Sequence, residues 1–493
     1  MKKLYSALTR YINVILSIFL LAIFVKKDEL YTPKEYHRYL LENSHFKNTK
    51  NLSRSERKSK GMPPNSYNER FYELTQNPYL GYPTTQKKFD LQNSILNNKI
   101  RGGALTGKVP GQDNESNWVS VGPNNVGGRT RGALFDLNDV ERDRVLAGGV
   151  SGGLWVNEDI DSPNNSEWSM VTGVPGNLSI SVIVQDPNNP DIMYAGTGES
   201  YTNSDAMGNG IYKSIDSGNN WTRVFGVNTE DIYIGLSQTQ AIVEGAFFIN
   251  DLQIWDPTPE NNSNSDEVIL AVVGQGSGYD GELNEFYDYQ THGLYKSADG
   301  GANWTKLSLP VNSNNRADDL NDIEVDLNNK IWVSTTRNIF WDAGGNFYHS
   351  TDATNFTQVS PTYPSVANNI RRVEFTPSST ETNTFYILLN ATEAEIYKTT
   401  DAFANLTKLS EPDDADRGIP SNDFTRNQAF YDLEIEVDPN DGDVVYVGGI
   451  DWFRSTDGGS NWTQITKWSN NADLNTLDCS VVHADQHGMY FDP

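Results

Sequence analysis

The chain has 493 residues, a single cysteine and a formal net charge of −27. One cysteine excludes an intramolecular disulfide and a cysteine-based zinc cluster. The charge is uneven, since residues 1–116 carry a net +9 and the remainder carries −36, and so acidic a body argues against DNA or RNA as a partner.

The N-terminus has the pattern of an export signal. Lys2, Lys3 and Arg10 precede an uncharged apolar run, YINVILSIFLLAIFV, at residues 11–25. This run has the length of a signal peptide and is short for a membrane span, although no small-x-small cleavage site follows it. We therefore predict a signal peptide over residues 1–25, with an uncleaved anchor as the alternative, and a secreted or cell-surface location.

Residues 26–116 are polar and basic, and their composition predicts a propeptide or linker. KEYHRYLLEN at 34–43 and ERFYELTQ at 69–76 could form short amphipathic helices. The stretches at 48–66 and 101–116 are rich in Gly, Ser, Asn and Pro and are typical of linkers.

From residue 117 onwards the sequence repeats every 50–70 residues. Each unit begins with an alternating strand that ends in Asp-Pro or a variant, and three further strands follow it. We name these strands a, b, c and d. Four strands per repeat predict an all-β fold, a β-propeller of four-stranded blades. The a strands fall at residues 131–137, 181–187, 251–257, 321–327, 371–377, 433–439 and 487–493.

A recurring phrase connects strand c to strand d. It reads SIDSGNNWT at 214–222, SADGGANWT at 297–305 and STDGGSNWT at 455–463, and three weaker copies bring the total to six. Six copies cannot be six active sites, so we predict a structural turn. Its aspartates accept backbone N–H bonds, its glycines supply unusual backbone angles, and its tryptophans are buried between blades. These residues are Asp216, Gly218, Trp221, Asp299, Gly301, Trp304, Asp352, Asp401, Asp457, Gly459 and Trp462.

The phrase resembles the Asp-box, or BNR, repeat of sialidases, xyloglucanase-type glycoside hydrolases and sortilin-like receptor domains. WVSVGPNNVGGRTRG at 118–132 and VHADQHGMYFDP at 482–493 resemble secreted bacterial proteins described as sortilin-like or glycosyl-hydrolase-like. In that family, a cargo type of Bacteroidetes type IX secretion, a sorting domain commonly follows the propeller. The resemblance thus implies a propeller over residues 117–493 and the type IX secretion machinery as a partner.

Two segments predict an incomplete propeller. HGMYFDP at 487–493 repeats strand a without its b, c and d, and is the start of a further blade. NWVSV at 117–121 matches the beginning of a d strand without its own a, b and c. We expect residues 117–121 to form the outer strand of the terminal blade in a longer protein.

A meander places the b–c and d–a loops together at one end, where variable loops favour a ligand site. The b–c loops at 198–209 and 275–292 combine carboxylates with tyrosines, which suits sugar binding or, with paired acids, glycoside cleavage. Solvated acidic loops that hold calcium are the alternative. The candidates are Glu199, Tyr201, Asp205, Asp280, Glu282, Glu285 and Asp288.

Arginines cluster at or near the starts of the a strands, which line the channel of a propeller. The ligand-binding candidates are Arg129, Arg372 and Arg426, with Arg131 and Arg371 beside them. Sialidases use such a cluster for a substrate carboxylate, but the Arg-Ile-Pro opening of that family is absent, so arginines that offset an acidic channel are the favoured interpretation. The xyloglucanase resemblance implies a catalytic aspartate in TDVGG, and here GVSGG at 149–153 has Val150 in that place.

HADQH places His483, Asp485 and His487 at alternate positions, which a strand would direct to one face. This pattern suits a divalent metal or a hydrogen-bonded buckle near the channel mouth. Calcium or another divalent metal is the only cofactor that these motifs suggest. We predict an extracellular protein that binds a glycan or a protein at its loop end, with a glycoside hydrolase as the alternative.

Overall fold

The structure is a computed structural model. It describes single positions and short stretches between residues 38 and 69 and, with short gaps, residues 128–492. The chain divides into two compact units, Met1–Pro83 and Thr84–Pro493. Within the described residues no helix has the length and apolarity to cross a membrane. The expected signal peptide at 1–25 and the expected d strand at 117–121 lie outside the described residues.

In the first unit a short helix, α3 (Arg54–Ser59), lies where the composition predicted a linker. A capping box explains it, because Glu56 N donates to Ser53 Oγ at 3.3 Å and Ser53 N donates to Glu56 Oε2 at 2.8 Å. Arg57 also forms a buried ion pair with Glu69. These six residues are therefore helical, and the role of the stretch as a linker stays a prediction.

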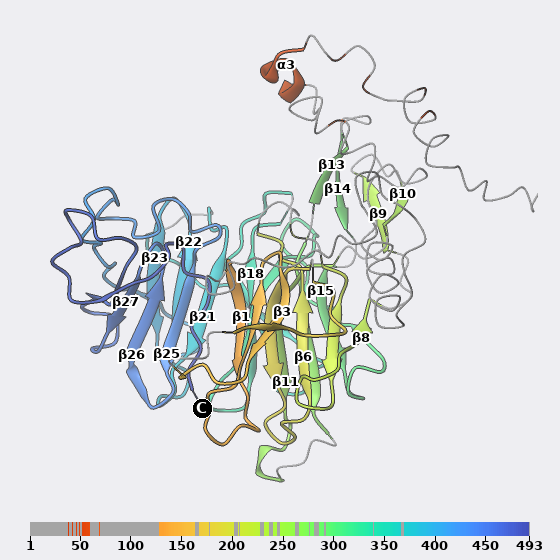
Figure 1. The fold of residues 1–493 in the computed structure, drawn as a ribbon, viewed down its shortest axis with the longest axis horizontal. Coiled ribbons are helices and arrows are strands. Elements are labelled where there is room, and N and C mark those ends of the chain that lie inside the picture. The colour runs from red at the N-terminus through yellow and green to blue at the C-terminus, as the bar shows by residue number, and fades with distance from the viewer. Residues whose placement is uncertain are drawn as a thin grey trace, which may run out of the picture. The chain divides into compact units, whose positions relative to one another are not determined.

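The second unit is a six-bladed β-propeller, as the repeat predicted (Figure 1). Each blade is an antiparallel meander of four strands, and neighbouring a strands are in contact from blade 1 through to blade 6. The blades, in order, are β1 (Thr130–Phe135), β2 (Val145–Gly149), β3 (Gly153–Asn157), β4 (Ser169–Met170); β5 (Ile180–Gln185), β6 (Met193–Thr197), β7 (Ile211–Ser214), β8 (Thr222–Phe225); β11 (Ile249–Trp255), β12 (Val268–Val273), β15 (Gly293–Ser297), β16 (Thr305–Lys306); β17 (Asp319–Val325), β18 (Ile331–Thr336), β19 (Phe347–Ser350), β20 (Thr357–Val359); β21 (Val373–Pro377), β22 (Phe385–Asn390), β23 (Ala394–Thr399), β24 (Thr407–Lys408); β25 (Glu434–Asp438), β26 (Asp441–Gly448), β27 (Trp452–Ser455) and β28 (Thr463–Gln464).

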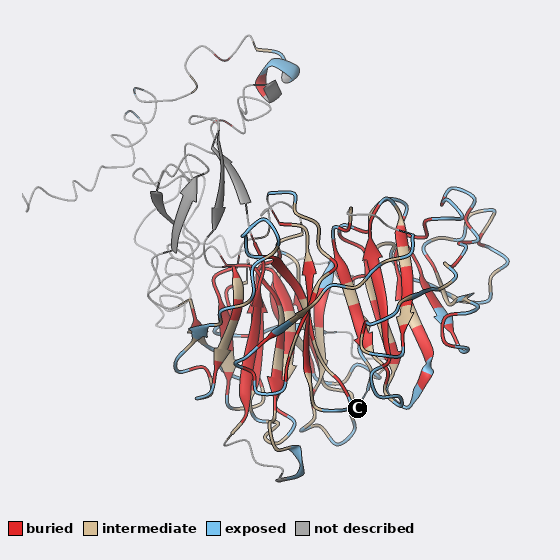
Figure 2. Ribbon diagram, turned by 180° about the vertical axis from the view of Figure 1, so that it is seen from behind, coloured by how far each residue is buried: buried red, intermediate tan, exposed pale blue. Residues whose placement is uncertain are grey.

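The core of the propeller lies between the blades. Five apolar clusters fill the five interfaces from blades 1 and 2 to blades 5 and 6, and the inner strands are the most buried part of the fold (Figure 2). Alternation along strand a divides the side chains: Val373 and Phe375 of β21 enter the core, whereas Arg372 and Glu374 line the channel. Burial between two sheets thus fixes which face of each a strand meets the channel.

The recurring c–d turn has the predicted hydrogen bonds. Ser297 Oγ donates to Asp299 Oδ1 (2.9 Å), and Asn303 donates its backbone N–H to the same oxygen (2.8 Å) and its side-chain amide to Oδ2 (2.7 Å). Gly301, with φ of +90°, donates its N–H to Ser297 Oγ (2.8 Å). Trp304 packs in the cluster between blades 2 and 3. The same bonds recur around Asp216 and Asp457, and closely related ones around Asp352 and Asp401.

We expect Asp299→Ala to lower the melting temperature by a few degrees and to leave any ligand affinity measured well below melting unchanged. The hydrogen bonds from Asn303 and Ser297 hold the pKa of Asp299 below its usual value, so the turn depends on the carboxylate. Thermal unfolding by circular dichroism measures the effect, with the exposed Glu260→Ala as control. An unchanged melting temperature, or lost binding at unchanged stability, would contradict the structural role.

The segment Asp485–Asp492 runs between blade 6 and blade 1. Gln486 N donates to Gly449 O (2.8 Å), and Tyr490 OH donates to Arg131 O (2.5 Å). The ring of Phe491 lies 5.7 Å from that of Tyr446. Residues 487–492 belong to no β-ladder, so the expected a strand at 487–493 is not formed as a paired strand. That this segment starts a further blade stays a prediction.

The acidic b–c loop of blade 3 is not a loop throughout. It contains β13 (Ser277–Asp280) and β14 (Glu285–Tyr289), which form a second four-stranded sheet with β9 (Asp231–Gly235) and β10 (Gln240–Val243). β13 and β14 are rich in aromatic residues, and β9 and β10 are rich in β-branched ones, which favour strands. The repeat gave no signal for this sheet because it occurs in one unit only.

Candidate functional site

A belt of polar side chains surrounds one mouth of the channel. At the start of successive a strands, a side chain donates to a backbone carbonyl of the next blade, which fixes neighbouring blades to each other. The bonds are Ser181 Oγ to Ile249 O, Asn250 Nδ2 to Leu320 O (3.0 Å), Asn321 Nδ2 to Val373 O (2.7 Å) and Arg372 Nη1 to Tyr431 O (2.7 Å). The b–c and d–a connections gather at this end, so we call it the channel mouth.

Arg131 and Glu199 form a buried ion pair at the channel mouth. Arg131 Nε donates to Glu199 Oε2 at 2.8 Å, and the two residues are 6% and 0% exposed. Tyr431 OH donates to the other carboxylate oxygen at 2.9 Å. Burial opposes the charge of Arg131, but Glu199, Tyr201 and Tyr431 together outweigh burial and raise the pKa of the guanidinium. Glu199 thereby connects blade 1 to the segment that enters blade 6.

Tyr201 lies between two guanidinium groups. Its ring centroid is 3.9 Å from Arg372 Cζ and 4.8 Å from Arg131 Cζ. Burial raises the pKa of the Tyr201 hydroxyl, so it stays protonated. The rings and guanidinium groups thus form a rigid cationic and aromatic wall.

Acidic side chains line the rest of the channel. A cavity of about 140 Å³ opens among them below the channel mouth. Burial, followed by repulsion between neighbouring carboxylates, raises the pKa of Asp251 to about 7 and that of Glu436 to about 8. The six acids are Asp251, Asp322, Glu324, Glu374, Glu434 and Glu436, and burial also raises the pKa of Asp322, Glu324 and Glu434 well above the usual values. At neutral pH several of these carboxyls therefore carry a proton.

Two polar atoms of residues that line this cavity have no hydrogen-bond partner among the described residues. They are Nε of Arg372 and Oδ1 of Asn321, whose residues are 3% and 1% exposed. Both side chains also donate to Glu374, Asn321 at 3.0 Å. Arg372 Nε is a hydrogen-bond donor and Asn321 Oδ1 is an acceptor, and both residues contact Glu374. Together they can bind a ligand group, such as a hydroxyl, that both accepts and donates a hydrogen bond.

His487 and Asp485 approach the same carboxyl group, and His483 does not join them. His487 Nδ1 lies 3.4 Å from Asp432 Oδ1, and Asp485 interacts with that carboxyl. Burial and then Asp485 raise the pKa of Asp432 to about 8, whereas burial and nearby arginines lower that of His487 to about 2. His483 is exposed, with Nδ1 2.8 Å from Ala484 O.

The expected alternation is absent because residues 483–487 form no strand and Asp485 has φ of +74°. The described residues contain no group of three His, Cys, Asp or Glu side chains arranged to hold a metal ion. His487 lines the channel cavity.

The other residues expected at the site are scattered. Arg129 is exposed, with Cζ 4.9 Å from the Tyr431 ring centroid, and Arg426 is exposed in the β24–β25 connection. Asp280 ends β13, and Glu285 and Asp288 lie on β14. Asp205 and Glu282 lie outside the described residues. Val150 lies in the β2–β3 turn and donates its N–H to Arg129 O (2.9 Å).

Sequence reasoning expected an acidic channel but named none of its acids as site residues, although a signal for them exists. NDIEVDL and LEIEVDP alternate acidic and apolar residues within an a strand. In a propeller such alternation directs the acids into the channel.

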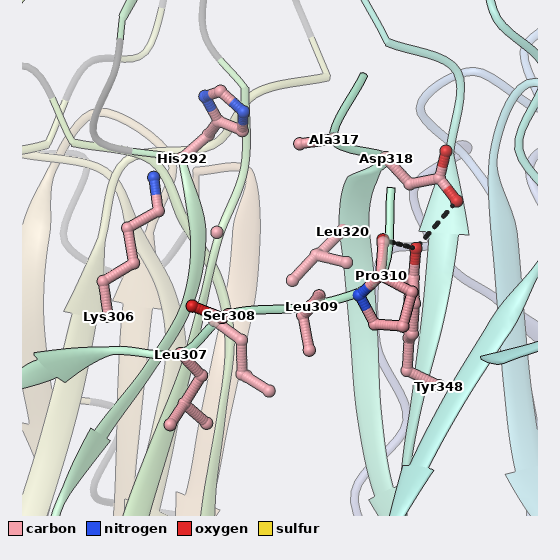
Figure 3. A pocket seen from close by; sticks show the side chains of 12 residues that line it. His292, Lys306, Leu307, Ser308, Leu309, Pro310, Ala317, Asp318, Leu320 and Tyr348 are labelled. Atoms are coloured by element: carbon pink, nitrogen blue, oxygen red, sulfur yellow. Dashed lines mark hydrogen bonds between the residues drawn. The ribbon is translucent and has the colours of Figure 1, made fainter. Parts of the chain in front are cut away.

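A second cavity, of about 220 Å³, lies between blades 3 and 4 (Figure 3). We call it the interblade pocket. His292 and Lys306 stand on one side of it, and Ala317, Asp318 and Tyr348 on the other. Tyr348 OH donates to Asp318 Oδ2 and Pro310 O, both at 3.0 Å. Its lining is otherwise mainly apolar and consists of Gly293, Leu294, Leu307, Ser308, Leu309, Pro310 and Leu320.

No protein-family model matches the sequence, and no curated protein matches it. Among solved structures, it is similar to the GH74 xyloglucanase from Xanthomonas campestris, with a TM-score of 0.41 and 15% identity over 70% of this chain and 54% of that one. The GH74 enzyme from Niastella koreensis gives a TM-score of 0.38 and 14% identity over 70% and 60% of the two chains. YCF48 from Cyanidioschyzon merolae gives a TM-score of 0.40 and 13% identity over 69% of this chain and 86% of that one. The chain covers less than two thirds of either GH74 enzyme, and at these identities the likeness concerns the fold alone.

Proposed function

We propose that this chain is an extracellular binding protein that takes the terminal sugar of a neutral glycan at the channel mouth. The observation that carries the proposal is the cavity of about 140 Å³ lined by six carboxyl groups, two guanidinium groups and two tyrosines. The ligand proposed here is neutral because an anionic one would meet six acids.

Protonated carboxyl groups suit sugar hydroxyls. A carboxylic acid offers one O–H donor and further acceptor positions, and each sugar hydroxyl needs both. Burial raises the pKa of Glu436 to about 8 and that of Asp251 to about 7, so near neutral pH Glu436 is mainly protonated and Asp251 partly protonated. Arg372 Nε and Asn321 Oδ1 supply one further donor and one further acceptor. The cavity is smaller than the roughly 300–1,000 Å³ of common ligand pockets, so we propose an end-on contact.

The second candidate function is glycoside hydrolysis. A carboxyl group with a pKa near 7, such as Asp251, can act as a general acid at neutral pH, which favours this candidate. Against it, Val150 takes the place that the xyloglucanase resemblance gives to a catalytic aspartate. Secretion through the signal at residues 1–25 and export by the type IX machinery belong to the same proposal.

Calorimetric titration of the purified chain with neutral oligosaccharides tests the proposal. We expect Glu434→Gln and Glu324→Gln to weaken binding at least tenfold, because each fixes a carboxyl as an amide without changing its shape. Glu381→Gln, an exposed acid in the turn after β21, is the matched control and should bind as the unaltered protein does. Equal affinity in all variants would place the glycan elsewhere, and release of reducing ends would establish the hydrolase instead.

A further inference from the structure

The blades share an aromatic contact at their interfaces. Tyr295, Tyr348, Tyr397 and Phe453 each lie two residues before the Ser or Thr that opens the recurring turn of blades 3 to 6. At three of these positions, a ring from the end of the preceding blade packs edge-on against this aromatic residue. The pairs are Phe225–Tyr295 (4.9 Å, 67°), Tyr363–Tyr397 (5.4 Å, 79°) and Phe424–Phe453 (5.8 Å, 76°).

At the fourth position, Tyr348, no ring of the described residues packs in this way, and the interblade pocket lies there. Tyr348 lines this cavity of about 220 Å³. Leu307 of blade 3 and Val359 of blade 4 occupy equivalent places. Leu307 donates its N–H to the carbonyl of Leu294, which precedes Tyr295, and Val359 is paired with Phe347, which precedes Tyr348. Four residues further on stand Val311 and Tyr363, respectively. The residue equivalent to the plugging tyrosine is thus a valine that is 50% exposed.

The opposite wall of the interblade pocket also carries a smaller side chain than the equivalent wall between blades 4 and 5. Leu320 and Val373 are equivalent, because the carbonyl of each accepts from an asparagine of the preceding blade. Three residues before them stand Ala317 and Ile370. Ile370 is 4% exposed and belongs to the core between blades 4 and 5, whereas Ala317 is exposed on the wall of the interblade pocket. Two smaller side chains therefore leave open between blades 3 and 4 a space that is filled between blades 4 and 5.

The filled interface shows what chemistry the open one suits. Tyr363 places its ring against Tyr397 and donates its hydroxyl to Gly345 O at 2.9 Å. Gly345 comes two residues before Phe347, as His292 comes two residues before Leu294. His292, which lines the interblade pocket, is thus equivalent to the residue whose carbonyl accepts the tyrosine hydroxyl in the next interface, and leucines line the pocket beside it.

We propose that the interblade pocket binds a small para-substituted phenol, with its ring edge-on to Tyr348 and its hydroxyl donated to the backbone carbonyl of His292. The apolar floor formed by Leu307, Leu309 and Leu320 contacts the ring, which removes apolar surface from water. This site is independent of the channel mouth, so it can fail or hold without affecting the proposed glycan binding.

Titration of the full chain with p-cresol, followed by ligand-observed NMR and calorimetry, tests the proposal. We expect p-cresol to bind in the millimolar range or tighter, and toluene, which lacks the hydroxyl, to bind at least fivefold more weakly. Val311→Tyr introduces the side chain that Tyr363 provides between blades 4 and 5, and Ala317→Ile introduces the one that Ile370 provides there. Each should weaken p-cresol binding at least tenfold, and both positions are exposed enough to tolerate the change.

Val140→Tyr is the matched control, because it makes the same substitution at a valine that is 89% exposed in a turn of blade 1. It should leave p-cresol affinity unchanged. Lack of p-cresol binding at 10 mM would overturn the proposal, as would equal binding by Val311→Tyr, Ala317→Ile and the control. Equal affinity for toluene would overturn the assignment of the hydroxyl. A tyrosine-containing peptide that binds where p-cresol does not would show a protein surface instead of a small-molecule pocket.

Discussion

Glu199→Ala should lower the free energy of unfolding by about 3–5 kcal/mol, because it leaves a buried guanidinium without its counter-charge. Glu199 is fully buried, and both of its oxygens are used, one by Arg131 Nε at 2.8 Å and one by Tyr431 OH at 2.9 Å. Arg131 is itself 6% exposed and cannot reach water to replace the lost charge. Urea unfolding followed by tryptophan fluorescence measures the change.

A double variant separates the ion pair from the space it fills. Arg131→Met combined with Glu199→Gln removes both charges and should recover much of the loss, since no buried charge is then left unpaired and the amide oxygen can still accept from Tyr431 OH. Asp473→Ala is the control, because its partner Arg417 is 84% exposed and such pairs contribute about 0–1 kcal/mol. A loss below about 1 kcal/mol for Glu199→Ala would show that Glu199 does not hold blade 1 to blade 6.

The blades could be predicted from the sequence because their signal is local and repeated. Alternation within each a strand and the Ser-x-Asp-x-Gly phrase depend on neighbours within about ten residues, as the bonds from Ser297 and Asn303 to Asp299 show. Repetition then identified the fold. The second sheet and α3 are not part of the repeat, so the repeat could not predict them. A capping box at Ser53 and Glu56 is nevertheless visible in the sequence.

The roles at the channel mouth could not be predicted, because they depend on contacts between distant residues. Glu199 and Tyr201 looked like loop residues available to a ligand, yet Glu199 meets partners 68 and 232 positions away. Because both of its carboxylate oxygens accept hydrogen bonds from those partners, Glu199 has a structural role and is not available to bind a ligand. Conversely, Asp322 and Glu434 looked like ordinary strand residues until four blades brought them into one channel.

Stability should be greatest near pH 4–5 and should fall as the pH rises to 8. Burial raises the pKa of Asp251 from 3.8 to about 7 and that of Glu436 from 4.5 to about 8. Between the unfolded and folded pKa values the folded protein holds more protons than the unfolded chain, so the free energy of unfolding falls with rising pH. For Asp251 alone the decline across this window is of the order of 4 kcal/mol.

Below pH 4 the trend reverses. Hydrogen bonds from Asn461 and Ser455 lower the pKa of Asp457 from 3.8 to about 2, and the other turn aspartates shift in the same direction. Their stabilisation is present above the unfolded pKa and is lost as the pH falls through the folded one. The channel carboxyls therefore set the upper pH limit of maximal stability, and the turn aspartates set the lower one.

Urea unfolding at pH 2.5, 4.5, 6 and 8 measures this profile, and 0.5 M NaCl separates its causes. Salt screens repulsion among the exposed acids but leaves the desolvated channel acids largely unchanged, so the decline from pH 4.5 to 8 should persist. Glu436→Gln removes one titrating group and should make the decline shallower, raising the melting temperature at pH 8 but not at pH 4.5. Glu381→Gln, exposed at the other end of the blade, should leave the slope as it is. A stability that is flat from pH 4.5 to 8, or a decline abolished by salt, would mean that the channel carboxyls ionise freely and that water reaches them.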